Sequence, residues 1–460
     1  MASRKDQLHS YQFMLQRAIS ALIMRETDPA QSPLRRGVGA AFVGVMVTVI
    51  VAAAFGIYGL LTKTGSSRWR VDNAVVVEKE TGAAFVYLGD ELIPTLNSTS
   101  AMLLAGQSPP KRFTVPRNSL AGVPRGAPVG IVGAPSSLPD TKHLLAGAWT
   151  SCRVPAKDVA GQATAATVLM VGTTVRGGRA VGDEGLYVRD ATTGGEFLLW
   201  HGHRYQLGGQ AVAAALFASG VEPTDVGSAW LNALPEADRI NEIVVPGAGD
   251  KSKAVAGRKV GDVLTDRRDA GRTNYLVLDD GLALLTPLQM DLLNSTRTIT
   301  PVPVPPNEIA KAPTSTRLTS TSPAAQRPPE RRPAQIPIPA ESGLCAEFDA
   351  SGDPAPGLAV VGGDTVGDTG IVTTKQTGEG GTLADRVVMN GGAAVVVRDR
   401  ESGTYAVVTD QGKRFPVESA EALSMLGYGD AFAVTMPRAL LSRIPTGPPL
   451  TRAGAATPAA

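Results

Sequence analysis

The longest feature in the hydrophobic pattern is an uninterrupted apolar run near the N-terminus, at residues 37–61. Its twenty-five residues carry no charge, and at roughly 1.5 Å per residue a helix of that length crosses a bilayer core of about 30 Å. The apolar region of a cleaved signal peptide is only about 7–15 residues long and begins earlier. We therefore predict one transmembrane helix at 37–61, rather than a signal peptide or a buried helix of a soluble protein.

A second helical pattern precedes this run, at residues 6–26. Its apolar residues recur at helical spacing: Leu8, Tyr11, Leu15, Ala18, Ile19, Leu22 and Ile23. The two prolines within 27–33 end the pattern before the membrane. Three roles suit such an amphipathic helix: lying on the inner membrane surface, docking on a partner, or leading into the span.

The distribution of positive charge around the apolar run predicts its orientation. Six basic residues precede it, with Arg35 and Arg36 at the membrane edge, and three follow it closely. Because positive residues accumulate on the cytoplasmic side, we expect residues 1–36 in the cytoplasm and the chain beyond 61 exported. The expected location is the cell (inner) membrane, with residues 62–72 as a short tether.

Beyond the tether the pattern changes to short apolar runs separated by turn residues. The chain has 51 glycines, 34 prolines and only 5% aromatic residues, which favours many short strands over long helices. About 380 exported residues are too many for one compact core. A net charge of +2 gives no reason to expect a nucleic-acid partner.

The exported part repeats itself. Residues 114–128 and 435–449 match at seven of fifteen positions without a gap, including Pro124 with Pro445 and Gly126 with Gly447. Such self-similarity is the signature of a repeated structural unit. A chance likeness of loops rich in proline and glycine does not explain this ungapped match.

A matching half lies upstream of each of these segments. Residues 88–106 and 408–427 both read as strand, tight turn, strand and short helix. Pro94 lies 30 residues before Pro124, and Pro416 lies 29 residues before Pro445. A third copy runs over 201–237 and a fourth, weaker one over 276–313, and for both a chance likeness stays open. We predict four units of a hairpin and two small helices, each packed on a neighbour or a central sheet.

These patterns define the expected fold class: a single-pass membrane protein whose exported α+β region has a central β domain flanked by four short repeats. The expected segments after the tether are repeat 1 at 73–139, the central β domain at 140–200 and 341–400, repeats 2 and 3 at 201–313, a flexible proline-rich loop at 314–340, repeat 4 at 401–452, and a disordered tail at 453–460.

The two cysteines, Cys152 and Cys345, both follow the span. An exported compartment permits a disulfide between them. On the chain-entropy model a bridge closing so long a loop stabilises by about 4–5 kcal/mol. It would pin the chain where it doubles back between the two halves of the central domain. Two unrelated buried thiols are the alternative.

The sequence offers no catalytic constellation. His201 and His203 alternate along a predicted hairpin with no cysteine or third histidine close by, so we interpret them as turn residues rather than metal ligands. No G-x-S-x-G elbow occurs. The segment GAGDKS at 247–252 comes nearest to a phosphate-binding loop, but Asp250 replaces the glycine before the lysine and would repel phosphate. We expect no catalytic residue, metal or cofactor.

Several motifs together resemble one family. They are SYQFMLQR at 10–17, VYLGDELIPTLNSTSAMLLAG at 86–106, PRGAPVGIVGAPSSL at 124–138 and VTDQGKRFPV at 408–417, with the single span and the cysteine pair. The chain resembles EccB, a membrane core component of the actinobacterial type VII (ESX) secretion system. It departs from better-known members in a shorter N-terminus and an Arg-Pro-rich loop.

The resemblance implies a central β domain flanked by four repeats, with one disulfide. It also implies self-association and assembly beside the EccC motor ATPase, EccD, EccE and the mycosin protease. The main hypothesis is therefore a structural, oligomerising subunit around the secretion channel. Family members are often labelled ATPases, so an ATPase is one alternative, although no nucleotide loop is recognisable here. A module that binds cell-wall glycan is another, since repeats often form recognition surfaces.

Overall fold

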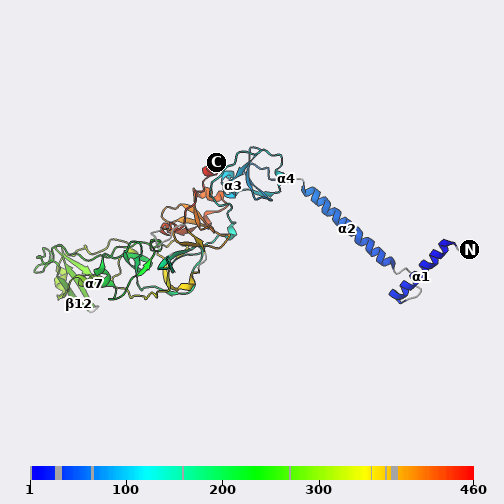
Figure 1. Ribbon diagram of the computed structural model, residues 1–460. Helices are drawn as coiled ribbons and strands as arrows, with labels where there is room; N and C mark the ends of the chain where they lie inside the picture. The colour runs from blue at the N-terminus through cyan, green and yellow to red at the C-terminus, as the bar shows by residue number, and fades with distance from the viewer. Residues whose placement is uncertain are drawn as a thin grey trace. The chain divides into compact units, whose positions relative to one another are not determined.

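The computed structural model describes residues 3–25, 34–63, 67–157, 160–268, 271–353, 355–367, 370–373 and 382–459 (Figure 1). It divides into two compact units. The first comprises residues 1–71 with 76–82 and 113–123, and the second comprises the rest of the chain.

Two helices form the N-terminal part, α1 (Arg4–Met24) and α2 (Leu34–Lys63) (Figure 1). Ser3 caps α1 by accepting a hydrogen bond from Lys5 N–H, and the Asp6 carboxylate accepts one from Ser3 N–H. Within α2, residues 37–59 are long and apolar enough to cross a membrane. The sequence prediction of one membrane helix here is confirmed, with an end two residues earlier than expected.

Four four-stranded sheets share one strand order: β3-β2-β1-β4, β10-β9-β8-β11, β14-β13-β12-β15 and β22-β21-β20-β23. In repeats 2 to 4 the first three strands form an antiparallel meander, and a helix returns the chain so that the fourth strand lies parallel to the first. The same arrangement four times over establishes one repeated structural unit.

The elements of each repeat are as follows. Repeat 1 contains β1 (Ala74–Glu78), β2 (Ala84–Leu88), β3 (Glu91–Thr95), α3 (Ser98–Ala105), β4 (Arg112–Val115) and α4 (Arg117–Leu120). Repeat 2 contains β8 (Leu186–Asp190), β9 (Glu196–Trp200), β10 (His203–Gln206), α5 (Gln210–Leu216), β11 (Thr224–Val226) and α6 (Ser228–Leu231). Repeat 3 contains β12 (Val263–Arg268), β13 (Gly271–Val277), β14 (Leu282–Leu285), α7 (Pro287–Thr296), β15 (Val302–Pro303) and α8 (Pro306–Lys311). Repeat 4 contains β20 (Ala394–Asp399), β21 (Tyr405–Thr409), β22 (Lys413–Val417), α9 (Ala420–Met425), β23 (Val434–Met436) and α10 (Arg438–Leu441).

In each repeat the segment that follows the second helix is hydrogen-bonded to the third strand through a proline carbonyl. We call this contact the proline closure. In repeat 1 the Leu92 N–H donates to the Pro124 carbonyl at 2.9 Å, and the Gly126 N–H donates back to the Leu92 carbonyl at 3.1 Å. Repeat 4 uses Arg414, Pro445 and Gly447 in the same way. The corresponding trios are Arg204, Pro235 and Ala237 in repeat 2, and Leu282, Pro313 and Ser315 in repeat 3.

The signature residues singled out in the sequence act at this closure. The carbonyls of Pro94 and Pro416, within the third strands, accept hydrogen bonds from Val129 and Leu450 N–H. A Cβ on Gly126 would lie 2.5 Å from Ile93 Cδ1, and one on Gly447 would clash with the Phe415 ring. At 447 the glycine leaves room for the Phe415 ring, whereas at 126 only the flexible end of Ile93 would have to move to admit a Cβ.

The predicted boundaries of the central domain are wrong in both halves. Residues 186–200 and 394–399 form β8, β9 and β20, which belong to the sheets of repeats 2 and 4. Strand β20 is buried along nearly its whole length, so it lacks the alternation that marks a half-exposed strand. Strand β8 is less deeply buried and alternates between buried and half-buried residues. A shared AVVV at 74–77 and 394–397 was the sequence signal for the true start of the repeat.

The central domain is a seven-stranded sheet in the order β18-β19-β6-β5-β16-β17-β7. Its strands are β5 (Trp149–Lys157), β6 (Ala163–Met170), β7 (Arg179–Ala180), β16 (Ser342–Phe348), β17 (Gly357–Gly362), β18 (Ile371–Val372) and β19 (Arg386–Val388). At its centre β5 and β16 run antiparallel with Cys152 opposite Cys345, and the two sulfurs form a disulfide. Strand β7 pairs with β17, the hairpin partner of β16, and strand β19 pairs with β6, the hairpin partner of β5.

Repeats 2 and 4 share one hydrophobic core with this sheet. A contiguous buried cluster includes Trp149 and Phe348 of the central strands, Trp230 of α6 and Leu440 of α10. The Trp230 indole N–H donates to the Ser151 carbonyl at 2.9 Å. A repeat of this size cannot bury its apolar face alone, and here the central sheet covers it.

The segment 314–340, predicted to be a flexible loop, is instead an ordered strap. The hydroxyls of Ser320 and Ser322 donate to the Asp238 carboxylate at 2.5 and 2.6 Å. The Leu288 N–H donates to the Glu330 carbonyl at 2.9 Å, and Ile336 joins the buried core. The prediction failed because the strap is held by scattered backbone and hydroxyl contacts, which leave no apolar period in the sequence.

The predicted disorder of residues 453–460 is also wrong for 453–459. Residues Arg452–Ala455 form helix α11, which packs against α3, and the C-terminal end lies beside α3 in Figure 1. The Gly130 N–H donates to the Thr457 carbonyl at 2.9 Å, and the Ala459 N–H donates to the Pro128 carbonyl at 2.8 Å. Small side chains look like a disordered tail in sequence, yet they permit this close backbone pairing.

We expect the double variant Cys152→Ser/Cys345→Ser to lower the melting temperature of the full chain. The bridge joins residues 193 apart in sequence, so its loss costs about 4–5 kcal/mol on the chain-entropy model. Differential scanning fluorimetry with and without reductant measures the effect. Reductant should shift the wild type toward the variant and leave the variant unchanged. Equal melting of wild type and variant would contradict a structural role for the bridge.

Candidate functional site

A reactive site would need titratable side chains gathered at one place. Across the described ranges, no group of three or more histidine, cysteine, aspartate or glutamate side chains is placed to hold a metal ion. His201 lies at the β9–β10 turn with Nε2 2.8 Å from Asp183 Oδ1, and the Nδ1 of the buried His203 lies 3.0 Å from the His201 carbonyl oxygen. Both histidines therefore stabilise the β9–β10 turn.

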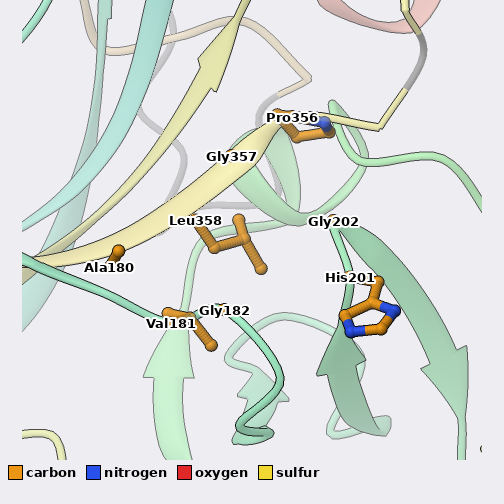
Figure 2. Close-up of a pocket in the computed structure, with 8 residues that line it drawn as sticks. All are labelled: Ala180, Val181, Gly182, His201, Gly202, Pro356, Gly357 and Leu358. Carbon is orange, nitrogen blue, oxygen red and sulfur yellow. The ribbon is translucent and has the colours of Figure 1, made fainter.

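A cavity of about 260 Å³ lies beside this turn (Figure 2). Its walls are the His201–Gly202 turn of repeat 2 and residues of β7 and β17. Figure 2 shows mainly Val181, Leu358 and backbone around it, and His201 is its one titratable residue. Ligand sites are usually larger, from about 300 Å³, and carry convergent polar groups. The cavity is a small gap left where repeat 2 packs against the central sheet.

The loop at 247–252 is folded in a way that does not cradle phosphate. Its N–H groups donate within the chain: Gly249 to the Val260 carbonyl at 2.9 Å, and Ser252 to the Arg258 carbonyl at 2.9 Å. A phosphate loop instead points its N–H groups at the ligand and leads into a helix. Here the chain continues into strand β12. The geometry gives this loop a structural role.

In repeats 1, 2 and 4 a buried carboxylate of the first strand contacts the first residue of the second helix. We call this contact the clamp. The first strand of each repeat carries a buried acidic residue: Glu78, Asp190, Asp266 and Asp399. In repeat 1, Arg117 Nε lies 2.6 Å from Glu78 Oε1. In repeat 4, Arg438 Nε lies 2.9 Å from Asp399 Oδ2. Repeat 2 replaces the arginine by a serine, and the Ser228 hydroxyl donates to Asp190 at 2.7 Å.

A second carboxylate completes the clamp in repeats 1 and 4. Glu80 accepts a hydrogen bond from the Arg117 N–H at 2.9 Å, and Glu401 accepts one from the Arg438 N–H at 2.7 Å. Each glutamate thus satisfies a free N–H at the start of the second helix. The clamp fixes that helix to the end of the first strand.

Sequence reasoning missed this clamp, although half of it was visible. Arg117 and Arg438 are among the seven identities of the repeat match. Their acidic partners lie in EKETG at 78–82 and DRESG at 399–403, upstream of the compared segments 88–106 and 408–427. Extending the comparison upstream would have found both.

Two opposing effects determine the pKa of Asp399. Burial acts to raise this pKa, but hydrogen bonds from the Ser402 N–H, the Arg438 guanidinium and the Glu401 N–H outweigh it, so the pKa falls below its usual value. The folded repeat therefore favours the charged carboxylate.

Helix α1 presents the largest group of uncovered apolar side chains among the described residues outside α2. The predicted stripe is exposed at Leu8, Tyr11, Leu15, Leu22 and Ile23. Phe13 and Met14 are also exposed, so the apolar surface extends beyond the predicted face. An uncovered apolar surface of this kind marks an interaction site or a membrane contact. Arg35 and Arg36 begin α2, but their side chains lie outside the described residues.

Comparison with known proteins gives one consistent match. The family model described as "Type VII secretion system ESX-1, transport TM domain B" matches residues 1–459. The chain is 27% identical over 481 residues to "ESX-3 secretion system ATPase EccB3" of Mycolicibacterium smegmatis, covering 98% of this chain and 90% of that protein.

Solved structures agree with this match. A chain of the intact ESX-5 inner membrane complex aligns over 100% of this chain and 96% of its own length, with a TM-score of 0.64 and 25% identity. The structure of the EccB3 dimer from the ESX-3 core complex aligns over 83% of this chain and 99% of its own, with a TM-score of 0.62 and 25% identity.

We expect Arg438→Ala to destabilise the protein by about 1–3 kcal/mol, because it leaves the buried Asp399 carboxylate without its guanidinium partner. Asp399→Asn should also destabilise it, because a neutral amide loses the charge-assisted hydrogen bonds from the Ser402 N–H and the Arg438 guanidinium. The charged form of Asp399 contributes fully above the unfolded pKa of about 3.9 and loses its effect as the pH falls through the lower folded pKa. The stability difference between wild type and Asp399→Asn should therefore shrink from neutral pH toward about pH 3.

Denaturant unfolding at several pH values measures these differences. Arg400→Ala is the matched control, because this neighbouring arginine is exposed, and it should change stability little. A pH-independent difference for Asp399→Asn would rule out the charged clamp.

Proposed function

This chain belongs to the EccB family of type VII secretion proteins, and we propose that it is a structural, oligomerising subunit of an ESX inner-membrane complex. The observation that carries the proposal is the match of the whole chain, helices and repeats together, to a chain of the intact ESX-5 inner membrane complex. The candidate membrane helix at 37–59 provides the corresponding anchor.

We propose that the exported repeats mediate self-association, as the solved EccB3 dimer of the ESX-3 core complex suggests by its likeness to most of this chain. A single apolar helix is too little to form a conducting pore alone, so the protein acts with further chains. The proposed partners are the remaining components of the machine: the EccC motor ATPase, EccD, EccE and the mycosin protease.

The relative from M. smegmatis carries the word ATPase in its name. For this chain we favour the scaffold role. The segment at 247–252, which comes nearest to a phosphate-loop pattern, donates N–H groups to carbonyls of the same chain. The energy for transport would then come from another subunit, and this chain would anchor and position it.

The proposed topology has α1 in the cytoplasm and the repeats outside the inner membrane. It rests on the excess of basic residues before the apolar run at 37–61 and on the disulfide between Cys152 and Cys345, which an oxidising exported compartment favours. The exposed apolar side chains of α1 then face cytoplasmic parts of the complex.

We expect the double variant Leu15→Asp/Leu22→Asp to prevent assembly, since charges on an apolar contact surface oppose docking. The measurement is the size of the detergent-solubilised complex on a native gel after co-expression with the other subunits. The control is Gln16→Asp, an equally exposed position on the same helix. An unchanged complex with the double variant would refute docking through α1.

The topology has a separate test. In intact spheroplasts, a membrane-impermeant maleimide should label an introduced Thr192→Cys and spare Lys5→Cys, since both positions are exposed in the fold and only the first is proposed to lie outside. The native cysteines are bonded to each other and give a low background. The opposite labelling pattern would reverse the topology.

A further inference from the structure

The strap at 314–340 begins with a segment rich in hydroxyl side chains. Seven of the ten residues at 314–323 are serine or threonine, and a proline ends the segment. Runs of serine and threonine that also contain proline are typical of O-glycosylated segments. The composition alone also fits an ordinary loop, and the structure adds the position of each hydroxyl.

The three serines of this segment face the fold. The Ser315 hydroxyl donates to Asp280 Oδ2 at 3.1 Å, and the hydroxyls of Ser320 and Ser322 donate to the Asp238 carboxylate at 2.5 and 2.6 Å. Ser315 is buried, and the other two serines are half-buried. The serines therefore anchor the strap to two carboxylates of repeats 2 and 3.

The four threonines of the same segment face the solvent. All four are exposed: Thr314, Thr316, Thr319 and Thr321. Their hydroxyls donate no hydrogen bond to any residue that the structure describes. Serine and threonine are thus divided between the two sides of the strap. The threonine hydroxyls are not needed to hold it, and they remain available for chemistry.

Exposed threonines elsewhere are placed differently. Thr192 and Thr193 lie in the tight turn between β8 and β9, where the Thr192 N–H donates to Asp190 and the Thr193 hydroxyl accepts from the Gly195 N–H. The threonines of the strap lie instead between α8 and the proline at 323, in a stretch without helix. An enzyme can reach several of their hydroxyls along one open segment.

We propose that these four strap threonines are acceptors for O-linked hexoses. The threonine Oγ1 attacks the anomeric carbon of a sugar carried on a lipid phosphate, and the bond from that carbon to the phosphate oxygen breaks. A base of the transferase takes the hydroxyl proton, and the lipid phosphate is the leaving group. The attached sugars cover the strap with bulky, hydrated groups. The inference rests on the proposed topology, which places the strap outside the membrane.

The test is mass spectrometry of the full chain, purified in detergent after expression in Mycolicibacterium smegmatis, the source of the EccB3 relative. Trypsin releases peptides 312–317 and 318–331, each with two of the four threonines. We expect both peptides to gain mass in whole hexose increments, and electron-transfer fragmentation to place each sugar on threonine. The chain made by cell-free synthesis without lipid-linked sugars should give bare peptides.

Two matched double variants separate the outward hydroxyls from the inward ones. Thr319→Val/Thr321→Val keeps the side-chain shape, so it should remove the sugar from its peptide and leave the melting temperature of the cell-free chain unchanged. Ser320→Ala/Ser322→Ala should keep the sugar and lower that temperature, because Asp238 loses both hydroxyl donors.

Three results would overturn the inference: bare strap threonines in the chain from M. smegmatis, sugar on the serines instead, or phosphate increments in place of hexose. The maleimide labelling of Thr192→Cys distinguishes this failure from a failure of the topology. Bare threonines on a chain that labels from outside refute the glycosylation alone, whereas a chain that labels only from inside refutes both.

Discussion

The pairing of β5 with β16 is the interaction on which the second unit depends. These strands come from opposite halves of the chain, and they meet with Cys152 directly opposite Cys345. Each leads into a hairpin, and each hairpin then receives a strand from the other half. Without this central pair, repeats 2 and 4 would lose the sheet that covers their apolar sides. The disulfide reinforces an arrangement that hydrogen bonds already define.

The repeats show how one architecture tolerates different chemistry at the same place. Repeats 1 and 4 hold the second helix with an arginine and a buried carboxylate, whereas repeat 2 uses the Ser228 hydroxyl on Asp190. The proline closure is more uniform, since all four repeats use it. Backbone hydrogen bonds impose the common shape, and side chains adjust its stability.

Sequence reasoning recovered the features that have a strong local signal. The charge-free run at 37–61, the recurring Pro124 and Pro445, and the cysteine pair each stand out without knowledge of the fold. It failed where the signal is non-local. Strand β20 is buried along nearly its whole length and resembles any core strand, and the strap at 314–340 is held by partners far away in sequence. The burial of the first-strand carboxylates, such as Glu78 and Asp399, could not be predicted, because burial of a charged residue follows only from the assembled repeats.

The order of the strands also constrains how the protein folds as it is made. Strand β5 is complete long before β16, since the residues that join them lie 193 positions apart. Until β16 and β19 appear, β5 and β6 expose unpaired edges and an apolar face. Such non-local pairing folds slowly and is open to aggregation. Repeat 3 and the strap lie between these strands in the chain, so they are synthesised while the centre of the protein still awaits its second half.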